Sequence, residues 1–110
     1  MERFVKGEVV VVLFPFSDLS EAKKRPALVL ADLLGNDIIL CQITSKFSDD
    51  IYAIPLNLSD FANGSLNKES YIRPNRIFTA DKNIITKRIG KLKPEKYVVV
   101  AESISRLIRL

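Results

Sequence analysis

The feature that most constrains the fold is a valine-rich segment near the start of the chain, Gly7 to Phe14 (GEVVVVLF). β-Branched residues favour the pleated, half-buried surface of a strand, and Pro15 ends the run because proline cannot donate a ladder hydrogen bond. The segment is flanked by charges and is too short to span a bilayer. No small-residue cleavage site follows it, so we expect a strand of a soluble protein.

Further β signals follow. Segments 27–31 and 38–44 are apolar and are separated by the turn cluster Gly35-Asn36-Asp37, which predicts a hairpin. The dipeptide Asn63-Gly64 indicates another turn. The other expected strands are 51–58, which Pro55 places at an edge or a bulge; 70–73 with 76–79, interrupted by Pro74; and 86–89, which ends at Gly90.

After Pro94 the spacing of apolar residues changes from that of a strand to that of a helix. Pro94 and Glu95 suit the first turn of a helix, and apolar residues then recur at helical spacing. These residues are Tyr97, Val100, Ala101, Ile104, Leu107 and Ile108. We therefore expect one domain over residues 1–110, a small and mostly antiparallel β barrel closed by a C-terminal helix.

Composition limits the possible chemistry. The chain has 110 residues, of which 47% are hydrophobic, enough for one core without disulfides. A single cysteine, Cys41, excludes an internal disulfide and suits a reducing cytoplasm. The net charge of +4 is a mild indication of polyanion binding. The chain has no histidine, which excludes Ser-His-Asp and Cys-His catalysis and metal sites that need imidazole.

Arg25 is the first candidate for a functional residue. It follows Lys23 and Lys24 and precedes Pro26, which biases Arg25 to an extended conformation at the expected start of a strand. A planar guanidinium with five donors matches phosphate geometry better than an ammonium does. The alternative is a solvated loop charge beside two lysines. In the functional interpretation, Lys23 and Lys24 add to nucleic-acid binding.

Thr44 and Ser45 are the second candidate. A hairpin centred near residues 35–36 would pair Ala27 with Thr44, which brings Arg25 beside both hydroxyls. A guanidinium and a hydroxyl there could together hold a phosphate. The alternative is that the two hydroxyls only satisfy backbone groups in a turn.

The segment YIRPNR is the third candidate. Tyr71 could stack on a base, while Arg73, Asn75 and Arg76 could contact phosphate or base edges. The alternative is an ordinary turn with a flanking edge strand.

The remaining reactive side chains carry weaker signals. Asp18 and Glu21 lie in the first long loop, and each could be a general base or a plain solvated acid. Cys41 lies inside an expected strand and is interpreted as a small core residue. Asp49-Asp50 is too short and isolated a pair to predict a metal site.

The order of these motifs resembles that of the PemK/MazF-type toxins, the ribonuclease halves of toxin–antitoxin pairs. The resemblance covers nearly the whole chain. The matching pieces are Gly7-Glu8-Val9-Val10, Phe14-Pro15, Arg25-Pro26-Ala27-Leu28-Val29, Ile43-Thr44-Ser45, Ser70-Tyr71-Ile72-Arg73, Arg76-Ile77-Phe78-Thr79, Ile89-Gly90-Lys91-Leu92 and the terminal helix.

The resemblance implies an SH3-like barrel that forms a homodimer and cleaves single-stranded RNA, usually mRNA, sequence-selectively. It implies attack by the RNA 2′-hydroxyl without a metal or other cofactor, and an antitoxin whose extended tail covers the RNA groove. Arg25 matches the catalytic arginine of the family and Thr44 its catalytic threonine. Arg73 matches a further catalytic arginine of some members.

One position departs from the family. Those members place a general-base aspartate two residues after the second arginine, where this chain has Asn75. An amide cannot take a proton from a 2′-hydroxyl, so either the base lies elsewhere, with Asp18 as a speculative choice, or activity is weak. Two other functions therefore remain open: a CcdB-like inhibitor of DNA gyrase, and a catalytically inactive module that binds nucleic acid or antitoxin.

Overall fold

The computed structural model describes residues 3–15, 22–47 and 49–109. Within these ranges the chain forms seven strands, one α-helix and two single-turn 3-10 helices. The strands are β1 (Glu8–Pro15), β2 (Ala22–Asp32), β3 (Asp37–Thr44), β4 (Ile54–Leu56), β5 (Phe61–Gly64), β6 (Ser70–Asp81) and β7 (Ile85–Leu92). The helices are η1 (Leu58–Asp60), η2 (Lys82–Ile84) and α1 (Pro94–Ile108).

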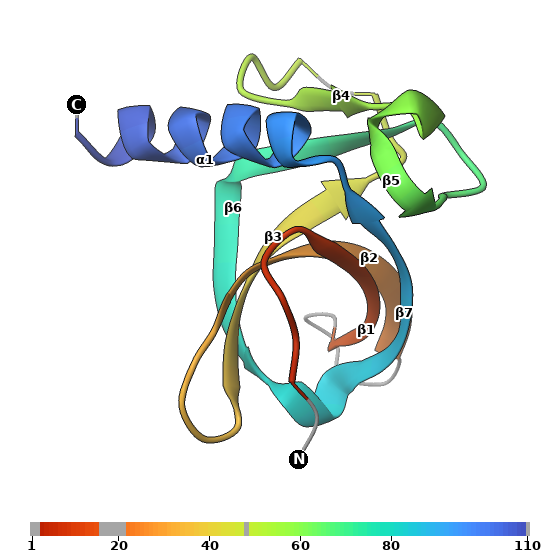
Figure 1. Ribbon diagram of the computed structural model, residues 1–110, viewed down its shortest axis with the longest axis vertical. Helices are drawn as coiled ribbons and strands as arrows, with labels where there is room; N and C mark the ends of the chain where they lie inside the picture. The colour runs from red at the N-terminus through yellow and green to blue at the C-terminus, as the bar shows by residue number, and fades with distance from the viewer. Residues whose placement is uncertain (1–2, 16–21, 48, 110) are drawn as a thin grey trace.

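The strands form one antiparallel sheet in the order β4-β6-β3-β2-β1-β7-β5. The sheet curls strongly on itself, and α1 lies across one end of β6 (Figure 1). This arrangement confirms the expected antiparallel β fold with a C-terminal helix. None of the helices in the described part of the chain has the length and hydrophobicity that a bilayer crossing needs.

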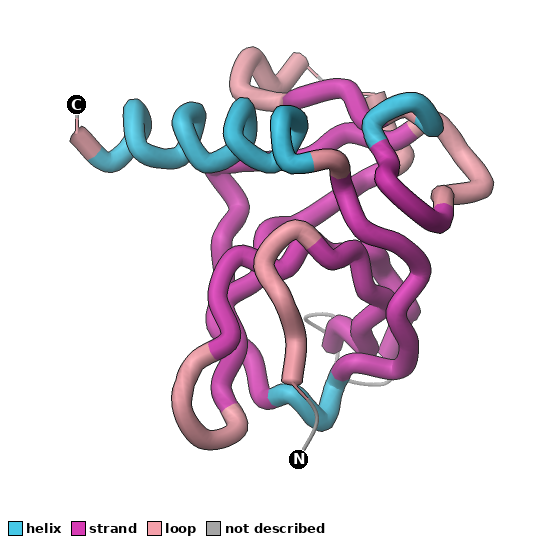
Figure 2. The backbone as a smooth tube through the Cα atoms, viewed as in Figure 1, coloured by secondary structure: helices cyan, strands magenta, loops and turns pink. Residues whose placement is uncertain are grey.

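The valine-rich strand is more deeply buried than its sequence predicts. Val9 packs with Val100 of α1 in one hydrophobic cluster, whereas Val10 and Val12 pack with Phe4 in a second one. Figure 2 shows why a second cluster exists, because the N-terminal segment runs across the front of the barrel before β1 begins. Both faces of β1 are therefore covered, which explains its unbroken apolar run, because strands that are buried on both faces have such runs.

Strand β2 begins earlier than expected. It starts at Ala22 rather than at residue 27, so Arg25 lies within the strand, opposite Val12 of β1. Lys23 and Lys24 are strand residues with exposed side chains, which disguised the strand as a polar loop in the sequence. The idea that Arg25 marks the start of a strand is therefore wrong.

The predicted hairpin forms, but its register differs by two residues. Ala27 pairs with Gln42 and not with Thr44. The turn closes one residue tighter than expected, with Asp32 opposite Ile38, and a bulge between Val29 and Ala31 shifts the pairing by one more. Hydrophobic pattern alone could not locate that bulge.

The second half of the sheet also departs from expectation. The strand expected over 51–58 contracts to β4, because Ile51 and Tyr52 lie in a turn. Strand β6 is continuous through Pro74, since that residue falls in a bulge between the pairs Cys41–Ile77 and Ile43–Ile72, where no ladder hydrogen bond is needed.

Strand β5 was not predicted, because it ends on the turn-forming dipeptide Asn63-Gly64. Gly64 has φ +75°, as a turn residue would, yet both residues pair with β7. A Cβ at Gly64 would lie 2.1 Å from the carbonyl oxygen of Ile89, so the close approach of β5 to β7 requires glycine.

Candidate active site

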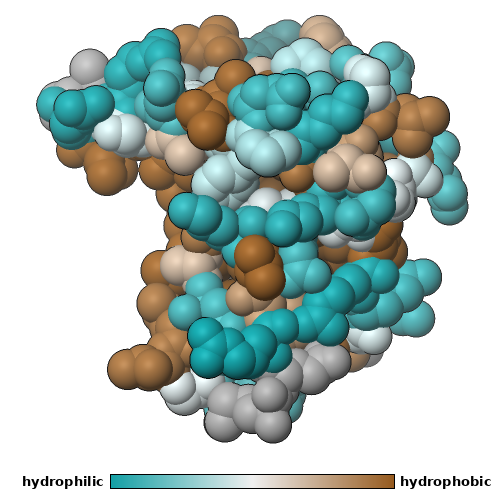
Figure 3. All heavy atoms as spheres, in the orientation of Figure 1, coloured by the Kyte–Doolittle hydropathy of each residue, from teal (hydrophilic) through white to brown (hydrophobic). Residues whose placement is uncertain are grey.

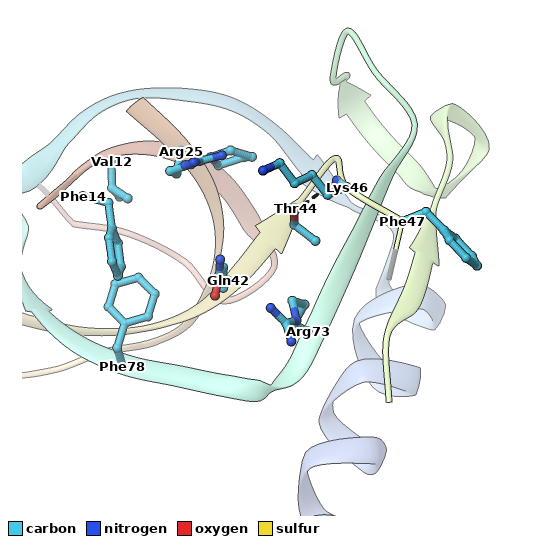
Figure 4. Close-up of a pocket in the computed structure, with 10 residues that line it drawn as sticks. Val12, Phe14, Arg25, Gln42, Thr44, Lys46, Phe47, Arg73 and Phe78 are labelled. Atoms are coloured by element: carbon cyan, nitrogen blue, oxygen red, sulfur yellow. Dashed lines mark hydrogen bonds between the residues drawn. The ribbon is translucent and has the colours of Figure 1, made fainter. Parts of the chain in front are cut away.

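A pocket of about 350 Å³, here called the central pocket, lies across four neighbouring strands. Figure 4 shows Arg25 and Lys46 along one side of it, with Gln42, Thr44 and Arg73 on the other. The lining residues are Val12 and Phe14 from β1, Arg25 and Pro26 from β2, Gln42 and Thr44 from β3, Lys46 and Phe47 after β3, and Arg73 and Phe78 from β6.

Arg25 and Thr44 meet in this pocket, as predicted, although through a different register. The pairing of β2 with β3 ends at Ala27–Gln42, and two residues further along each strand come Arg25 and Thr44. Both side chains are half-buried. The adjacent strands therefore place a guanidinium and a hydroxyl together on rigid backbone.

The hydroxyl of Thr44 also has a local partner. Its Oγ1 accepts a hydrogen bond of 3.1 Å from the backbone N–H of Lys46, which is the turn role considered as the alternative. A hydroxyl that accepts one hydrogen bond can still donate its proton. The backbone contact therefore orients Thr44 without removing it from phosphate chemistry.

Arg73 enters the pocket from β6 and is held from behind. Its Nε donates to Oδ2 of Asp50 at 3.0 Å, and its backbone carbonyl accepts a hydrogen bond of 3.0 Å from the thiol of Cys41. A hydrogen bond from the backbone N–H of Tyr52, together with the hydrogen bond from Arg73, holds the pKa of Asp50 below its usual range. Arg73 thus faces the pocket as a cation with a charged partner.

Cys41 is a core residue, as expected from its strand position. It is fully buried, and that burial raises the pKa of its thiol to about 12. A thiol with such a pKa is not a nucleophile near neutrality. Across the described residues, no group of three acidic or cysteine side chains lies close enough to hold a metal ion.

A second pocket of about 390 Å³, here called the lateral pocket, adjoins the first. The two pockets share Arg25, Pro26 and Thr44. The remaining residues of the lateral pocket are Lys24, Ile43, Ser45, Leu66, Asn67, Lys68 and Ser70. The predicted residues Lys24 and Ser45 therefore lie beside Arg25 and Thr44, on the other side from Arg73.

Other predicted residues lie outside both pockets. Tyr71 is half-buried, and its ring meets that of Phe47 edge to face at 5.9 Å. Asn75 and Arg76 are exposed on the bulged part of β6, and Lys23 is exposed on β2. Asp18, like Glu21, lies outside the described residues.

The sequence did not reveal several residues of the central pocket. Phe14 and Phe78 meet edge to face at 5.2 Å and form its apolar wall, and Gln42 lies between that wall and Thr44 (Figure 4). These residues lie on β1, β3 and β6, which are far apart in the sequence and come together only because the sheet curls. The local feature of the sequence that pointed to this apolar wall was Phe14, which directly precedes Pro15 at the end of a strand.

Comparison with known proteins agrees with the family resemblance of the sequence. Residues 5–108 match the family described as "PemK-like, MazF-like toxin of type II toxin-antitoxin system". No curated protein sequence matches the chain.

Several solved structures share the fold. A MazE-MazF structure from Deinococcus radiodurans is 16% identical with a TM-score of 0.78, covering 100% of this chain and 99% of that one. An endoribonuclease from Mycobacterial species is 14% identical with a TM-score of 0.76, covering 100% and 95%. The Mycobacterium tuberculosis toxin MazF-mt6 is 20% identical with a TM-score of 0.68, covering 92% and 97%. With the family match spanning nearly the whole chain, this protein belongs to the PemK-like, MazF-like toxins of type II toxin–antitoxin systems.

Proposed function

We propose that this toxin is an endoribonuclease that cleaves single-stranded RNA, chiefly mRNA, without a metal ion. The observation that carries the proposal is the central pocket, where Arg25, Thr44 and Arg73 come together from three strands. RNA supplies its own nucleophile, so a protein needs mainly to position it and to stabilise charge. This chemistry requires no histidine.

In the proposed reaction the 2′-oxygen attacks the adjacent phosphorus and the bond from phosphorus to the 5′-oxygen breaks. The guanidinium groups of Arg25 and Arg73 stabilise the negative charge that develops on the phosphorane oxygens. The hydroxyl of Thr44 donates to one of those oxygens. The 2′-hydroxyl loses a proton to a base, for which Asp18 remains the candidate. The leaving 5′-oxygen takes a proton from the guanidinium of Arg25, which regains one from water, and the products are a 2′,3′-cyclic phosphate and a 5′-hydroxyl.

The two pockets support a path for the RNA. Because they share Arg25 and Thr44, a strand crossing from one pocket to the other passes its phosphate over these two residues. Lys24, Ser45 and Lys68 of the lateral pocket then contact the flanking backbone. Further along the surface, Lys23 and Arg76 add positive charge, and Tyr71 with Phe47 offers aromatic surface to a base.

We also propose a homodimer and an antitoxin partner in the cytoplasm. The helix α1 exposes Val98, Val99 and Ile108, the last of which is 77% exposed. Figure 3 shows hydrophobic atoms gathered beneath the projecting end of the helix, as expected of an interface. One structural neighbour is an endoribonuclease from Mycobacterial species in complex with its cognate antitoxin, and another is the MazE-MazF structure from Deinococcus radiodurans. Sedimentation that shows only monomer at micromolar concentration would contradict the dimer.

The test uses purified wild-type protein and Arg25→Ala on a long mRNA in excess EDTA. We expect the wild type to cut at defined sequences, with 2′,3′-cyclic phosphate and 5′-hydroxyl ends, and the variant to leave the RNA intact. If both leave it intact and Arg25→Ala still arrests growth, the ribonuclease proposal fails and a gyrase-type inhibitor is favoured. If neither cuts the RNA nor arrests growth, an inactive binding module is favoured.

A further inference from the structure

The carboxylate of Asp50 lies nearly buried behind the central pocket, where it pairs with Arg73. Its side chain is 7% exposed, and its partner Arg73 is 20% exposed. Asp50 lies in the segment between β3 and β4, far in sequence from Arg73, and does not itself line the pocket. It therefore affects the pocket through the residue that it holds.

Asp50 is fixed in place by its own turn. The backbone N–H of Tyr52 donates to Oδ1 at 2.9 Å, and the N–H of Ala53 donates to the backbone carbonyl of Asp50 at 3.2 Å. Oδ2 then accepts from Nε of Arg73 at 3.0 Å. Each carboxylate oxygen thus has a defined partner, and the group has no freedom to follow a mobile arginine.

Arg73 is fixed at both ends of its side chain. Its carbonyl accepts the thiol of Cys41, and the next residue, Pro74, is fully buried and has a restricted φ. With Nε bonded to Asp50, the guanidinium plane is set, and its four terminal N–H donors are directed from a fixed fork. The side-chain amide of Asn75 is close enough to add to the lowering of the pKa of the same carboxylate.

We propose that Asp50 is a positioning residue for the ribonuclease reaction, which locks the guanidinium of Arg73 in the orientation that receives the scissile phosphate. The proposal rests on the proposed function. It gives Asn75 a role as a second clamp on Asp50, in place of the general-base role that its position has in some relatives. The proposal does not make Asp50 the general base, because its side chain does not line the central pocket.

The decisive variant is Asp50→Asn, which keeps an oxygen for the N–H of Tyr52 but removes the charge that holds Arg73. We expect kcat to fall by about tenfold to a hundredfold, because a small misplacement of a catalytic group costs rate in that range. KM should stay close to that of the wild type. Because the lowered pKa of Asp50 means that its charge also stabilises the fold, cleavage is measured at a temperature where both proteins are folded. The matched control is Asp49→Asn, an exposed neighbour, which should behave as the wild type.

A double-mutant cycle shows whether Asp50 acts through Arg73. In an Arg73→Ala background, Asp50→Asn should cause no further loss of kcat, because the residue it positions is already absent. Additive losses in the double variant, or an unchanged kcat in Asp50→Asn alone, would overturn the proposal while leaving the ribonuclease function standing.

NMR provides a readout that needs no cleavage. The Nε–H of Arg73 should give a protected signal in the wild type that is lost in Asp50→Asn and kept in Asp49→Asn. An Arg73 Nε–H that exchanges freely in the wild type would overturn the proposal even if RNA is cut. A protected signal in a wild type that cuts no RNA would refute the proposed function and, with it, the role of Asp50.

Discussion

Two of the aspartates that pair with a cation in the described part of the chain lie near opposite ends of the β2–β3 hairpin. Asp50 pairs with Arg73 beside the central pocket, and Asp32 pairs with Lys82 near the turn. Lys82 also donates to the carbonyl oxygens of Leu33 and Gly35, at 3.3 and 3.0 Å, so its ammonium is held by the turn as well as by its ion pair with Asp32.

The two pairs differ in role: the Asp32 pair stabilises the fold, whereas the Asp50 pair orients a residue of the central pocket. Asp32 also accepts the backbone N–H of Phe4 at 2.8 Å, so its pair closes the N-terminal segment onto the turn. The Arg73 pair uses only Nε, and the remaining fork faces a pocket. Similar ion pairs therefore hold the fold in one place and aim a reactive group in the other.

The largest effects are expected where the pocket itself is changed. Arg25→Lys keeps the charge but loses the planar fork, and Thr44→Ala loses the hydroxyl; each should lower kcat by roughly a hundredfold to a thousandfold. The measurement is cleavage of a labelled RNA under single-turnover conditions. Arg106→Lys on α1 and Thr79→Ala on β6, both exposed, are the controls that should keep full rate. Full activity in Arg25→Lys would show that the site needs only a charge, as the Lys82 pair does.

Asp32→Asn should have the opposite profile. It removes the charge that faces Lys82, so the thermal midpoint should fall, whereas kcat should stay within about twofold because the site is distant. Thermal unfolding and cleavage are measured on the same preparation, with cleavage at a temperature where both proteins are folded. A loss of rate larger than the loss of folded protein would mean that the two ends of the hairpin are coupled.

Lowering the pH should destabilise the fold by protonating the aspartates of both pairs, Asp32 and Asp50. The hydrogen bond from Lys82, followed by that from Phe4, holds the pKa of Asp32 below its ordinary value of 3.8, and Asp50 is lowered likewise. A lowered folded-state pKa stabilises the fold above 3.8, and that contribution is lost as pH falls through the folded pKa. Denaturant unfolding at a series of pH values should give a shallower acid decline for Asp32→Asn than for wild type. Equal slopes would show that Asp32 does not titrate with folding.

Asn75→Ala should lower activity modestly, because Asn75 clamps Asp50 and takes no proton. We expect a decrease smaller than that caused by Asp50→Asn, measured as kcat on the same RNA. A loss as complete as that of Arg25→Ala would show that Asn75 has a direct part in the chemistry.

The smallest expected effect lies outside both pairs. Lys23→Ala should leave kcat unchanged and weaken RNA binding, reducing the slope of log K against log salt by about 0.7 if one phosphate contact is lost. Fluorescence anisotropy at several salt concentrations measures this slope. Lys87→Ala, an exposed lysine on β7, is the matched control. An unchanged slope would remove Lys23 from the RNA path.

The sequence predicted the parts of this site that depend on neighbouring segments. Arg25 and Thr44 belong to one hairpin, so their proximity could be inferred even with the register wrong by two residues. The helix from Pro94 was equally clear, because its apolar spacing and its first-turn proline agree.

The rest of the site depends on contacts that no local pattern encodes. Asp50 reaches Arg73 because β4 pairs with β6, and Phe78 meets Phe14 because β6 curls toward β1. The strand content of 22–26 was hidden by its exposed lysines, and the bulge at Pro74 looked like a break. In each case the pairing with a neighbouring strand, rather than the local amino-acid composition, determined the secondary structure.

The described residues between β3 and β4 contribute to the pocket rather than to the core. Lys46 and Phe47 belong to the pocket wall and Asp50 supports Arg73, yet none of these three belongs to either buried cluster. A substitution at Lys46 or Phe47 therefore reshapes the pocket wall without removing a side chain from the buried core that folds the barrel.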